Sequence, residues 1–182
     1  MEPISNFPAR LWKKLMDIPC SSFPLLALSY RPAKAKLKDE SVQNCFIFFG
    51  KTAYRERWGE DPNRTLIRIA DIEDIFPSEY QLPPRFASLV CSHSEVSWGG
   101  HEFTLTMGDG KSFYYSVGGI ADFINYPEGY SARVISDVHP RIPQDILRDH
   151  RDAVLSGPNY AWCLFEESEL PPEELSVNFH IL

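Results

Sequence analysis

The sequence predicts an α+β fold: a single domain, residues 1–182, with a mainly antiparallel β-sheet and two or three short helices. Three observations predict it. Six or more short apolar segments have the length or alternation of strands, short turns join most of them, and a few other segments repeat apolar residues at helical spacing. The composition, 43% hydrophobic and 24% charged, is that of a globular chain and excludes a disordered, collagen-like or coiled-coil protein.

The first expected element is a short amphipathic helix over residues 7–18. Its apolar residues recur at spacings of three and four, with charged residues between them. Pro8 suits the first turn of a helix, and Pro19 cannot continue one. Residues 25–30 follow as a candidate strand, and the stretch 31–40 is expected to be a polar, charged connection.

The middle of the chain predicts several short strands. Residues 44–50 form a continuous apolar run that ends in glycine, which is typical of a buried central strand. Residues 65–69 repeat this pattern with β-branched side chains, and a short helical turn is expected from Asp71 to Pro77. The remaining segments of this region are a proline-containing loop at 81–85 and two expected strands at 87–92 and 94–98.

The clearest local pattern is a β-hairpin over residues 101–117. Both arms alternate apolar and polar residues with a period of two, and Gly108-Asp109-Gly110 joins them. This alternation places six apolar side chains on one face, which we expect to be buried. They are Phe103, Leu105 and Met107 on the first arm and Phe113, Tyr115 and Val117 on the second.

The last third of the chain predicts one more helix and further strands. Residues 131–138 alternate as a strand does. A helix is expected over about 143–155, because Pro143 suits its first turn and Gly157-Pro158 its end. Two more strands are expected at 160–165 and 176–182, on either side of an acidic loop at 166–174. No internal repeat is evident in the sequence.

The amino-terminal residues and the cysteines favour a cytoplasmic protein. Residues 1–10 lack the basic and apolar stretches of a secretory signal, and no apolar run reaches the roughly 20 residues that a membrane-spanning helix needs. The four cysteines form no Cys-x-x-Cys pair, so we expect reduced and mostly buried thiols. The sequence predicts no cofactor, no metal site and no membrane contact.

Two segments imitate the end of a phosphate-binding loop: Gly50-Lys51-Thr52 and Gly110-Lys111-Ser112. Bulky residues at 46–49 precede the first segment, and the second belongs to the turn of the predicted hairpin. Neither provides the bare glycine backbone that wraps around a phosphate. The sequence therefore excludes nucleotide binding through these segments.

Reactive side chains concentrate at Cys91, His93 and Glu95, with His101 shortly after them. If residues 91–95 are extended, the first three side chains project from the same side of a strand, about 6–7 Å apart. A thiol, an imidazole and a carboxylate can form a nucleophile with its base, or part of a zinc site. One hypothesis is therefore a small enzyme with a site around Cys91, His93 and His101; the simpler interpretation is an ordinary edge strand.

The formal net charge of −7 is unevenly distributed along the chain. Residues 1–68 have 12 basic and 7 acidic side chains, a net charge of +5, whereas residues 69–182 have 6 and 18, a net charge of −12. Acidic side chains concentrate near the end of the chain: Asp145, Asp149, Asp152, Glu166, Glu167, Glu169, Glu173 and Glu174. The leading hypothesis is a non-enzymatic module that binds another, basic protein through this acidic surface, as an inhibitor, an antitoxin or immunity-like protein, or an adaptor.

The basic segment 30–68 suggests a third function. Aromatic side chains are interspersed among its positive ones, and this combination can track a nucleic-acid backbone and stack on bases. The candidate residues are Tyr54, Arg55, Arg57 and Trp58. The negative net charge disfavours nucleic acid as a partner, unless the basic residues gather on a face of their own.

Overall fold

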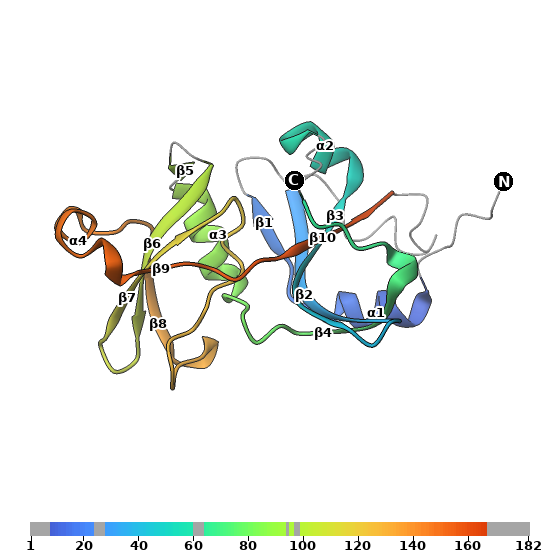
Figure 1. The fold of residues 1–182 in the computed structure, drawn as a ribbon, viewed down its shortest axis with the longest axis horizontal. Coiled ribbons are helices and arrows are strands. Elements are labelled where there is room, and N and C mark those ends of the chain that lie inside the picture. Colours follow the sequence, from blue (N-terminus) through green and yellow to red (C-terminus); the bar gives the residue numbers. More distant parts are fainter. Residues whose placement is uncertain (1–7, 24–27, 60–63, 94, 97–98, 167–182) are drawn as a thin grey trace. The chain divides into compact units, whose positions relative to one another are not determined.

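The computed structural model describes residues 8–23, 28–59, 64–93, 95–96 and 99–166, and it confirms the α+β class (Figure 1). Its strands form two mainly antiparallel mixed sheets, where the sequence predicted one sheet. The described chain divides into two compact units, each with its own sheet. The first unit contains residues 8–22, 28–78 and 160–166, and the second contains Phe23 and residues 79–159. That residues 1–182 form a single domain stays a prediction.

The sheet of the first unit contains β1, β2, β3 and β10 in this order, and β4 also pairs with β2. Strands β2 and β3 form an antiparallel hairpin, β4 runs antiparallel to β2, and β10 runs parallel to β3. The bounds are β1 (Ser21–Phe23), β2 (Leu28–Leu37), β3 (Val42–Gly50), β4 (Ile72–Phe76) and β10 (Ala161–Phe165). The structure confirms the central strand predicted at 44–50 and the strand predicted at 160–165.

The predicted amino-terminal helix is present as α1 (Ala9–Met16), slightly shorter than the expected range of 7–18. Leu11, Trp12 and Leu15 of this helix are buried against one face of the sheet. Alternate residues of the neighbouring strands β3 and β10 supply that face, because strand side chains alternate between faces. They are Phe46 and Phe48 of β3 and Ala161, Cys163 and Phe165 of β10.

Three predictions in this unit are wrong. The strand expected at 65–69 is only an isolated bridge at Leu66, and a 3-10 turn begins at Ile69. The connection expected at 31–40 is mostly strand β2, in which Ala33 and Ala35 are buried while Lys34 and Lys36 alternate with them. The lysines between the buried alanines led to the interpretation of this alternating segment as a charged connection. The helical turn expected from Asp71 is strand β4, preceded by the 3-10 turn η2 (Ile69–Asp71), because pairing with β2 decides its conformation.

An ion pair joins α1 to β4 and predicts a pH dependence. Lys14 Nζ lies 2.6 Å from Asp74 Oδ1. Burial raises the pKa of Asp74 and is the largest single effect. The hydrogen bonds from Lys14 and from the backbone N–H of Ile75, together with the nearby positive charges, outweigh it, so this pKa lies below its ordinary value of 3.8. The stabilisation is therefore complete above the unfolded-state pKa and disappears as the pH falls through the lower folded-state pKa.

We expect Asp74→Asn to reduce the free energy of unfolding at neutral pH by less than about 1 kcal/mol, because both partners contact solvent. Urea unfolding of the wild type and the variant between pH 7 and pH 2.5 measures the difference. The two stabilities should converge at the acidic end. A difference that is constant over this range would contradict a contribution from the ionised carboxylate.

The sheet of the second unit contains β5, β6, β7 and β9 in this order, and β8 also pairs with β6. The predicted hairpin at 101–117 is confirmed as β6 and β7, with Leu105 opposite Phe113 and Phe103 opposite Tyr115. Of its six apolar side chains, Phe113 alone is only partly buried. The bounds are β5 (Glu95–Val96), β6 (Gly100–Met107), β7 (Ser112–Val117), β8 (Ile135–His139) and β9 (Val154–Leu155).

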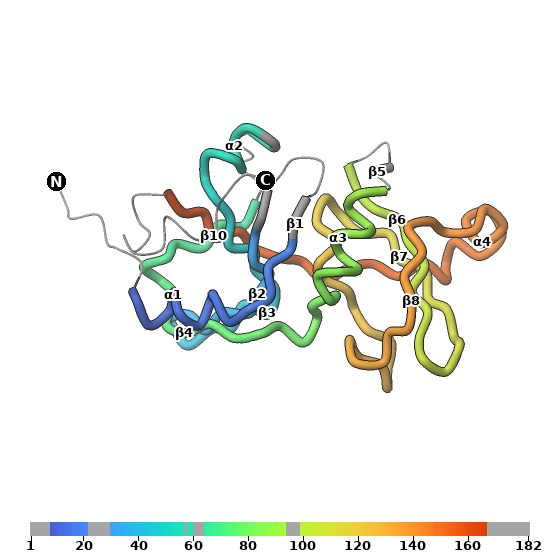
Figure 2. The backbone as a smooth tube through the Cα atoms, turned by 180° about the vertical axis from the view of Figure 1, so that it is seen from behind, coloured from blue at the N-terminus to red at the C-terminus, as the bar shows by residue number. Residues whose placement is uncertain are grey.

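A helix, α3 (Pro84–His93), occupies the region where the sequence suggested a loop and a strand. It packs against β6 and β8 (Figure 2). The carbonyl oxygen of Pro83 accepts hydrogen bonds from the backbone N–H groups of Phe86 and Ala87, so the two prolines begin a helix instead of ending an element. Of the strand expected at 94–98, the described residues Glu95 and Val96 form strand β5.

The helix expected over 143–155 is also corrected. It ends early, as α4 (Gln144–Asp149), and is followed by the 3-10 turn η4 (Arg151–Ala153) and by β9. Val154 and Leu155 pair with Tyr114 and Tyr115 of β7, and this tertiary pairing overrides the helical spacing. The strand expected at 131–138 begins as the 3-10 turn η3 (Ala132–Val134), and the strand expected at 176–182 lies outside the described residues.

The two units repeat the same arrangement of elements. In each, a helix precedes a short strand and a long hairpin, and a 3-10 turn then leads into a strand that pairs antiparallel with the first hairpin arm. A further strand pairs parallel with the second arm. The corresponding elements are α1, β1, β2, β3, η2, β4 and β10 in the first unit and α3, β5, β6, β7, η3, β8 and β9 in the second.

The repeat extends to details of hydrogen bonding. In the two hairpin turns, Asp39 Oδ1 and Asp109 Oδ1 each accept the backbone N–H of the residue two positions later, at 3.0 and 3.1 Å. The residue between them has a positive φ in both turns, 69° at Glu40 and 86° at Gly110. A bulge also interrupts the pairing of β2 with β4 and of β6 with β8 at the equivalent step. The expectation of no internal repeat is therefore wrong for the structure.

Candidate functional site

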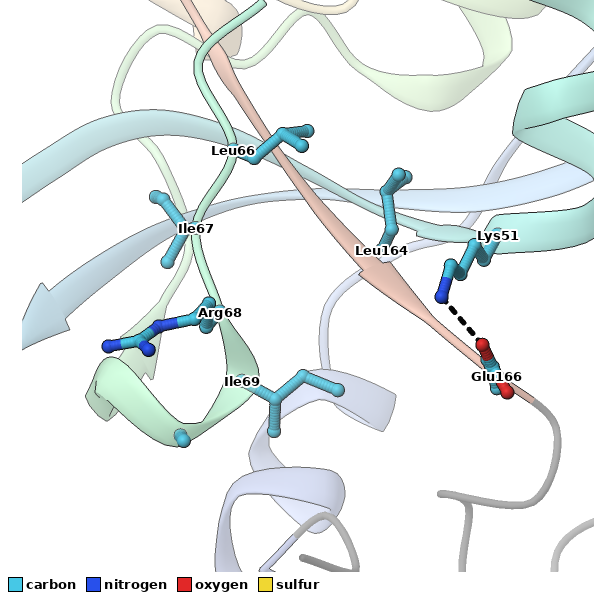
Figure 3. A pocket seen from close by; sticks show the side chains of 8 residues that line it. Lys51, Leu66, Ile67, Arg68, Ile69, Leu164 and Glu166 are labelled. Atoms are coloured by element: carbon cyan, nitrogen blue, oxygen red, sulfur yellow. Dashed lines mark hydrogen bonds and ion pairs between the residues drawn. The ribbon is translucent and has the colours of Figure 1, made fainter. Parts of the chain in front are cut away.

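A pocket of about 380 Å³ lies in the first unit, between the end of β10 and the segment 66–70. Figure 3 shows that this segment runs beside β10 at Leu66 and then diverges from it. Lys51, which follows β3 directly, and Glu166, which follows β10 directly, also line the pocket. The volume is near the lower end of the range for ligand-binding pockets.

The backbone of β10 leaves hydrogen-bonding groups facing this pocket. The outward N–H of Trp162 donates to the carbonyl oxygen of Thr65 at 2.9 Å, and the carbonyl oxygen of Trp162 accepts from the N–H of Ile67 at 2.7 Å. Successive residues of a strand direct these groups to opposite edges, so those of Cys163 face β3 and those of Leu164 face outward again. Among the described residues, none pairs with the outward backbone groups of Leu164.

The lining of the pocket is mostly apolar. Leu66 is 58% exposed, which is unusual for a large apolar side chain, and Leu164 is partly buried. Ile67 and Ile69 are buried and form its inner wall. In Figure 3, Arg68 points away from the ion pair at the other end of the pocket. Exposed leucine beside open backbone groups is typical of a surface that another chain covers.

One ion pair borders the pocket. Lys51 Nζ lies 2.6 Å from Glu166 Oε1 (Figure 3). The hydrogen bond from Lys51 holds the pKa of Glu166 below its ordinary value. Both side chains contact solvent, at 34% and 54% exposure, so this pair contributes little to stability. It gives the apolar pocket one charged border.

The residues predicted to bind nucleic acid lie on α2 (Lys51–Trp58), against the sheet face opposite α1. Tyr54 is buried and contacts the ring of Trp162, with centroids 5.0 Å apart. It is therefore not available as an exposed stacking surface. Trp58 is partly buried, Arg55 is exposed, and the side chain of Arg57 lies outside the described residues.

The structure places the predicted reactive residues on different elements. Cys91 is buried in α3, whereas His93 is exposed at the end of this helix, with its Nδ1 2.7 Å from Ser92 Oγ. Residues two positions apart on a helix face different directions, so the common face expected for Cys91, His93 and Glu95 is wrong. His101 is buried in β6, and its backbone lies opposite Glu95 of β5.

The predicted acidic surface is only partly described. Glu166 is exposed in the first unit, and Asp145, Asp149 and Asp152 are exposed in the second. Arg148 bonds Asp149 at 2.7 Å, so basic side chains interrupt the acidic ones there. Glu167, Glu169, Glu173 and Glu174 lie outside the described residues.

The described residues contain no group of three or more His, Cys, Asp or Glu side chains that could hold a metal ion. None of the helices in these parts of the chain is long and apolar enough to cross a membrane. The pocket is the feature that sequence reasoning missed, since it depends on the parallel pairing of β10 with a strand more than 100 positions earlier. Comparisons with family models, with curated proteins and with solved structures find no match for this chain.

Proposed function

We propose that this protein is a binding module for another protein, and that an extended segment of the partner pairs with the outer edge of β10. The observation that carries this proposal is the outward-facing backbone of Leu164 in an apolar pocket. An added strand gains affinity from main-chain hydrogen bonds and specificity from pockets for alternate side chains. The pairing of Thr65 and Ile67 with Trp162 shows that β10 already accepts a neighbour along the first half of this edge.

The charge of the protein supports a basic partner. The net charge of −7 attracts positively charged proteins and speeds their association. The acidic surface proposed from the sequence would act in this way, as a source of attraction in addition to the specific contact at β10. Such a protein would serve as an inhibitor, an antitoxin or immunity-like protein, or an adaptor.

A proline substitution tests strand addition directly. Leu164→Pro removes the N–H that faces the pocket, and proline is tolerated where a strand's N–H faces outward. Linear peptides selected on the wild-type protein from a random phage-displayed library provide the probe. We expect such peptides to alternate apolar residues and to bind Leu164→Pro at least about tenfold more weakly, as measured by isothermal titration calorimetry.

Two variants control for this experiment. Leu164→Val keeps the backbone N–H and should retain binding. Leu66→Lys changes an exposed side chain at the pocket, so it should weaken binding without unfolding the protein. Circular dichroism shows whether each variant is folded. Equal affinity of the peptides for the wild type, Leu164→Pro and Leu66→Lys would overturn the proposal, as would a selection that returns no peptide.

A further inference from the structure

Three aromatic rings in contact with one another lie on the same side of one guanidinium group in the first unit. Arg64 Cζ lies 5.4, 5.5 and 5.4 Å from the ring centroids of Tyr54, Trp58 and Trp162. The rings also contact one another, with centroids 5.0 to 5.5 Å apart. A cation within about 6 Å of an aromatic face is attracted by the ring. These three rings, which we call the aromatic cage, therefore form a cation site that Arg64 occupies.

The cage rings have supports other than Arg64. Phe49 lies 5.5 Å from Trp58 and 5.9 Å from Trp162, measured between centroids, and meets both edge to face. Tyr160 contacts Trp162 at 5.7 Å. Because these contacts come from β3 and from the residue just before β10, they would hold Trp58 and Trp162 in place if the side chain of Arg64 left. Such a preformed site costs a ligand little ordering entropy.

The internal repeat shows that the cage is an addition to the common fold. Helix α2, which carries Tyr54 and Trp58, follows β3 in the first unit. The equivalent segment after β7, residues 118–131, contains no helix, although the rest of the arrangement is the same. The repeated fold therefore forms without α2. Its presence in one unit only suggests a role besides folding.

We propose that the aromatic cage binds a quaternary ammonium group, and that Arg64 is a built-in occupant which this ligand displaces. A tethered side chain competes at a high effective concentration, so a displacing ligand must suit the rings better than a guanidinium does. A quaternary ammonium group does so, because it can present its charge to all three rings at once, and aromatic rings recognise such groups.

Titration with choline tests the proposal. The indole N–H signals of Trp58 and Trp162 in two-dimensional NMR report on the cage itself. We expect choline to shift both signals in the wild type, and Arg64→Ala to tighten binding by about tenfold, because the variant removes the competing occupant. The neutral alcohol 3,3-dimethylbutan-1-ol has the same shape without the charge and should bind much more weakly. Leu164→Pro should leave choline binding unchanged, which separates this site from the one at β10.

Matched variants of one ring define the interaction. Trp58→Phe keeps an aromatic face and should retain choline binding, whereas Trp58→Leu keeps an apolar side chain and should lose it. Binding to Arg64→Ala but not to the wild type would overturn the proposal, since Arg64 would then be a permanent part of the core. Equal binding of choline and the neutral alcohol would also overturn it. If a trimethyllysine peptide binds more tightly than choline, the site is supported and its ligand belongs to a protein. If choline binds more tightly than the peptide, the site is supported and its ligand is a small molecule.

Discussion

Replacing Phe48 with alanine is expected to lower the free energy of unfolding by about 3–5 kcal/mol. Phe48 is 1% exposed in the core between α1 and the sheet. Its ring stacks on Phe165, with centroids 4.4 Å apart, and meets Trp12 edge to face at 6.2 Å. The substitution leaves a cavity between three elements that are distant in sequence. Chemical denaturation with urea measures the loss.

The matched control is a second phenylalanine of the same sheet. Phe76 ends β4 and is 41% exposed, so Phe76→Ala removes less buried area and is expected to cost at most about 1 kcal/mol. Equal losses for the two variants would contradict the assignment of Phe48 to the core.

The parts of the fold that the sequence predicted correctly are those governed by local pattern. The apolar run 44–50 has the length of a buried strand and ends in glycine, and the arms of 101–117 alternate with the period of two that only a strand satisfies. The errors arose where a distant partner decides the conformation. Residues 154–155 follow a helix, yet they are a strand because Tyr114 and Tyr115 of β7 are available to pair.

The repeat escaped sequence analysis for a related reason. Equivalent residues are separated by 75 positions at Pro8 and Pro83, by 70 at Asp39 and Asp109, and by 63 at the first residues of β4 and β8. Loops of different length cause this drift, so no constant period exists. The visible signals were a shared Pro-x-Arg where each helix begins and a shared Ile-x-Asp at the start of each later strand. Both are too short to establish a repeat on their own.

The candidate sites depend still more on tertiary structure. Tyr54 and Trp58 were identified from the sequence as aromatic residues near basic ones, but the cage needs Trp162, which pairing with β3 brings beside them. The pocket needs the end of β10 and the divergence of residues 66–70 from it. No spacing within either segment indicates such a meeting, because the pairing register is decided by the sheet as a whole.

Gly157→Ala is expected to destabilise the second unit by about 1–3 kcal/mol through overpacking. A Cβ atom at this position would lie 2.6 Å from the backbone oxygen of Phe123 and 3.4 Å from Val117 Cγ1. The Phe123 segment has little freedom to shift. The backbone N–H of Leu82 donates to the carbonyl of Asp122, and that of Ile124 donates to Tyr80, at 2.7 and 3.0 Å.

Gly108→Ala is the control in the same unit, since its Cβ would make an ordinary contact of 3.5 Å with Val134 and should change stability by less than about 0.5 kcal/mol. Equal stabilities of the two glycine variants would contradict the close approach at Gly157.

Hydrogen exchange resolved by peptide adds a test of domain organisation, because amides that open only by global unfolding lose protection together. If residues 1–182 form one cooperative domain, Gly157→Ala in the second unit lowers protection in β3 of the first unit as much as in β6 of its own. Phe48→Ala in the first unit likewise lowers protection in β6 as much as in β3. If each variant affects only the strands of its own unit, the two copies of the repeated fold are stable independently, and the prediction of a single domain is wrong.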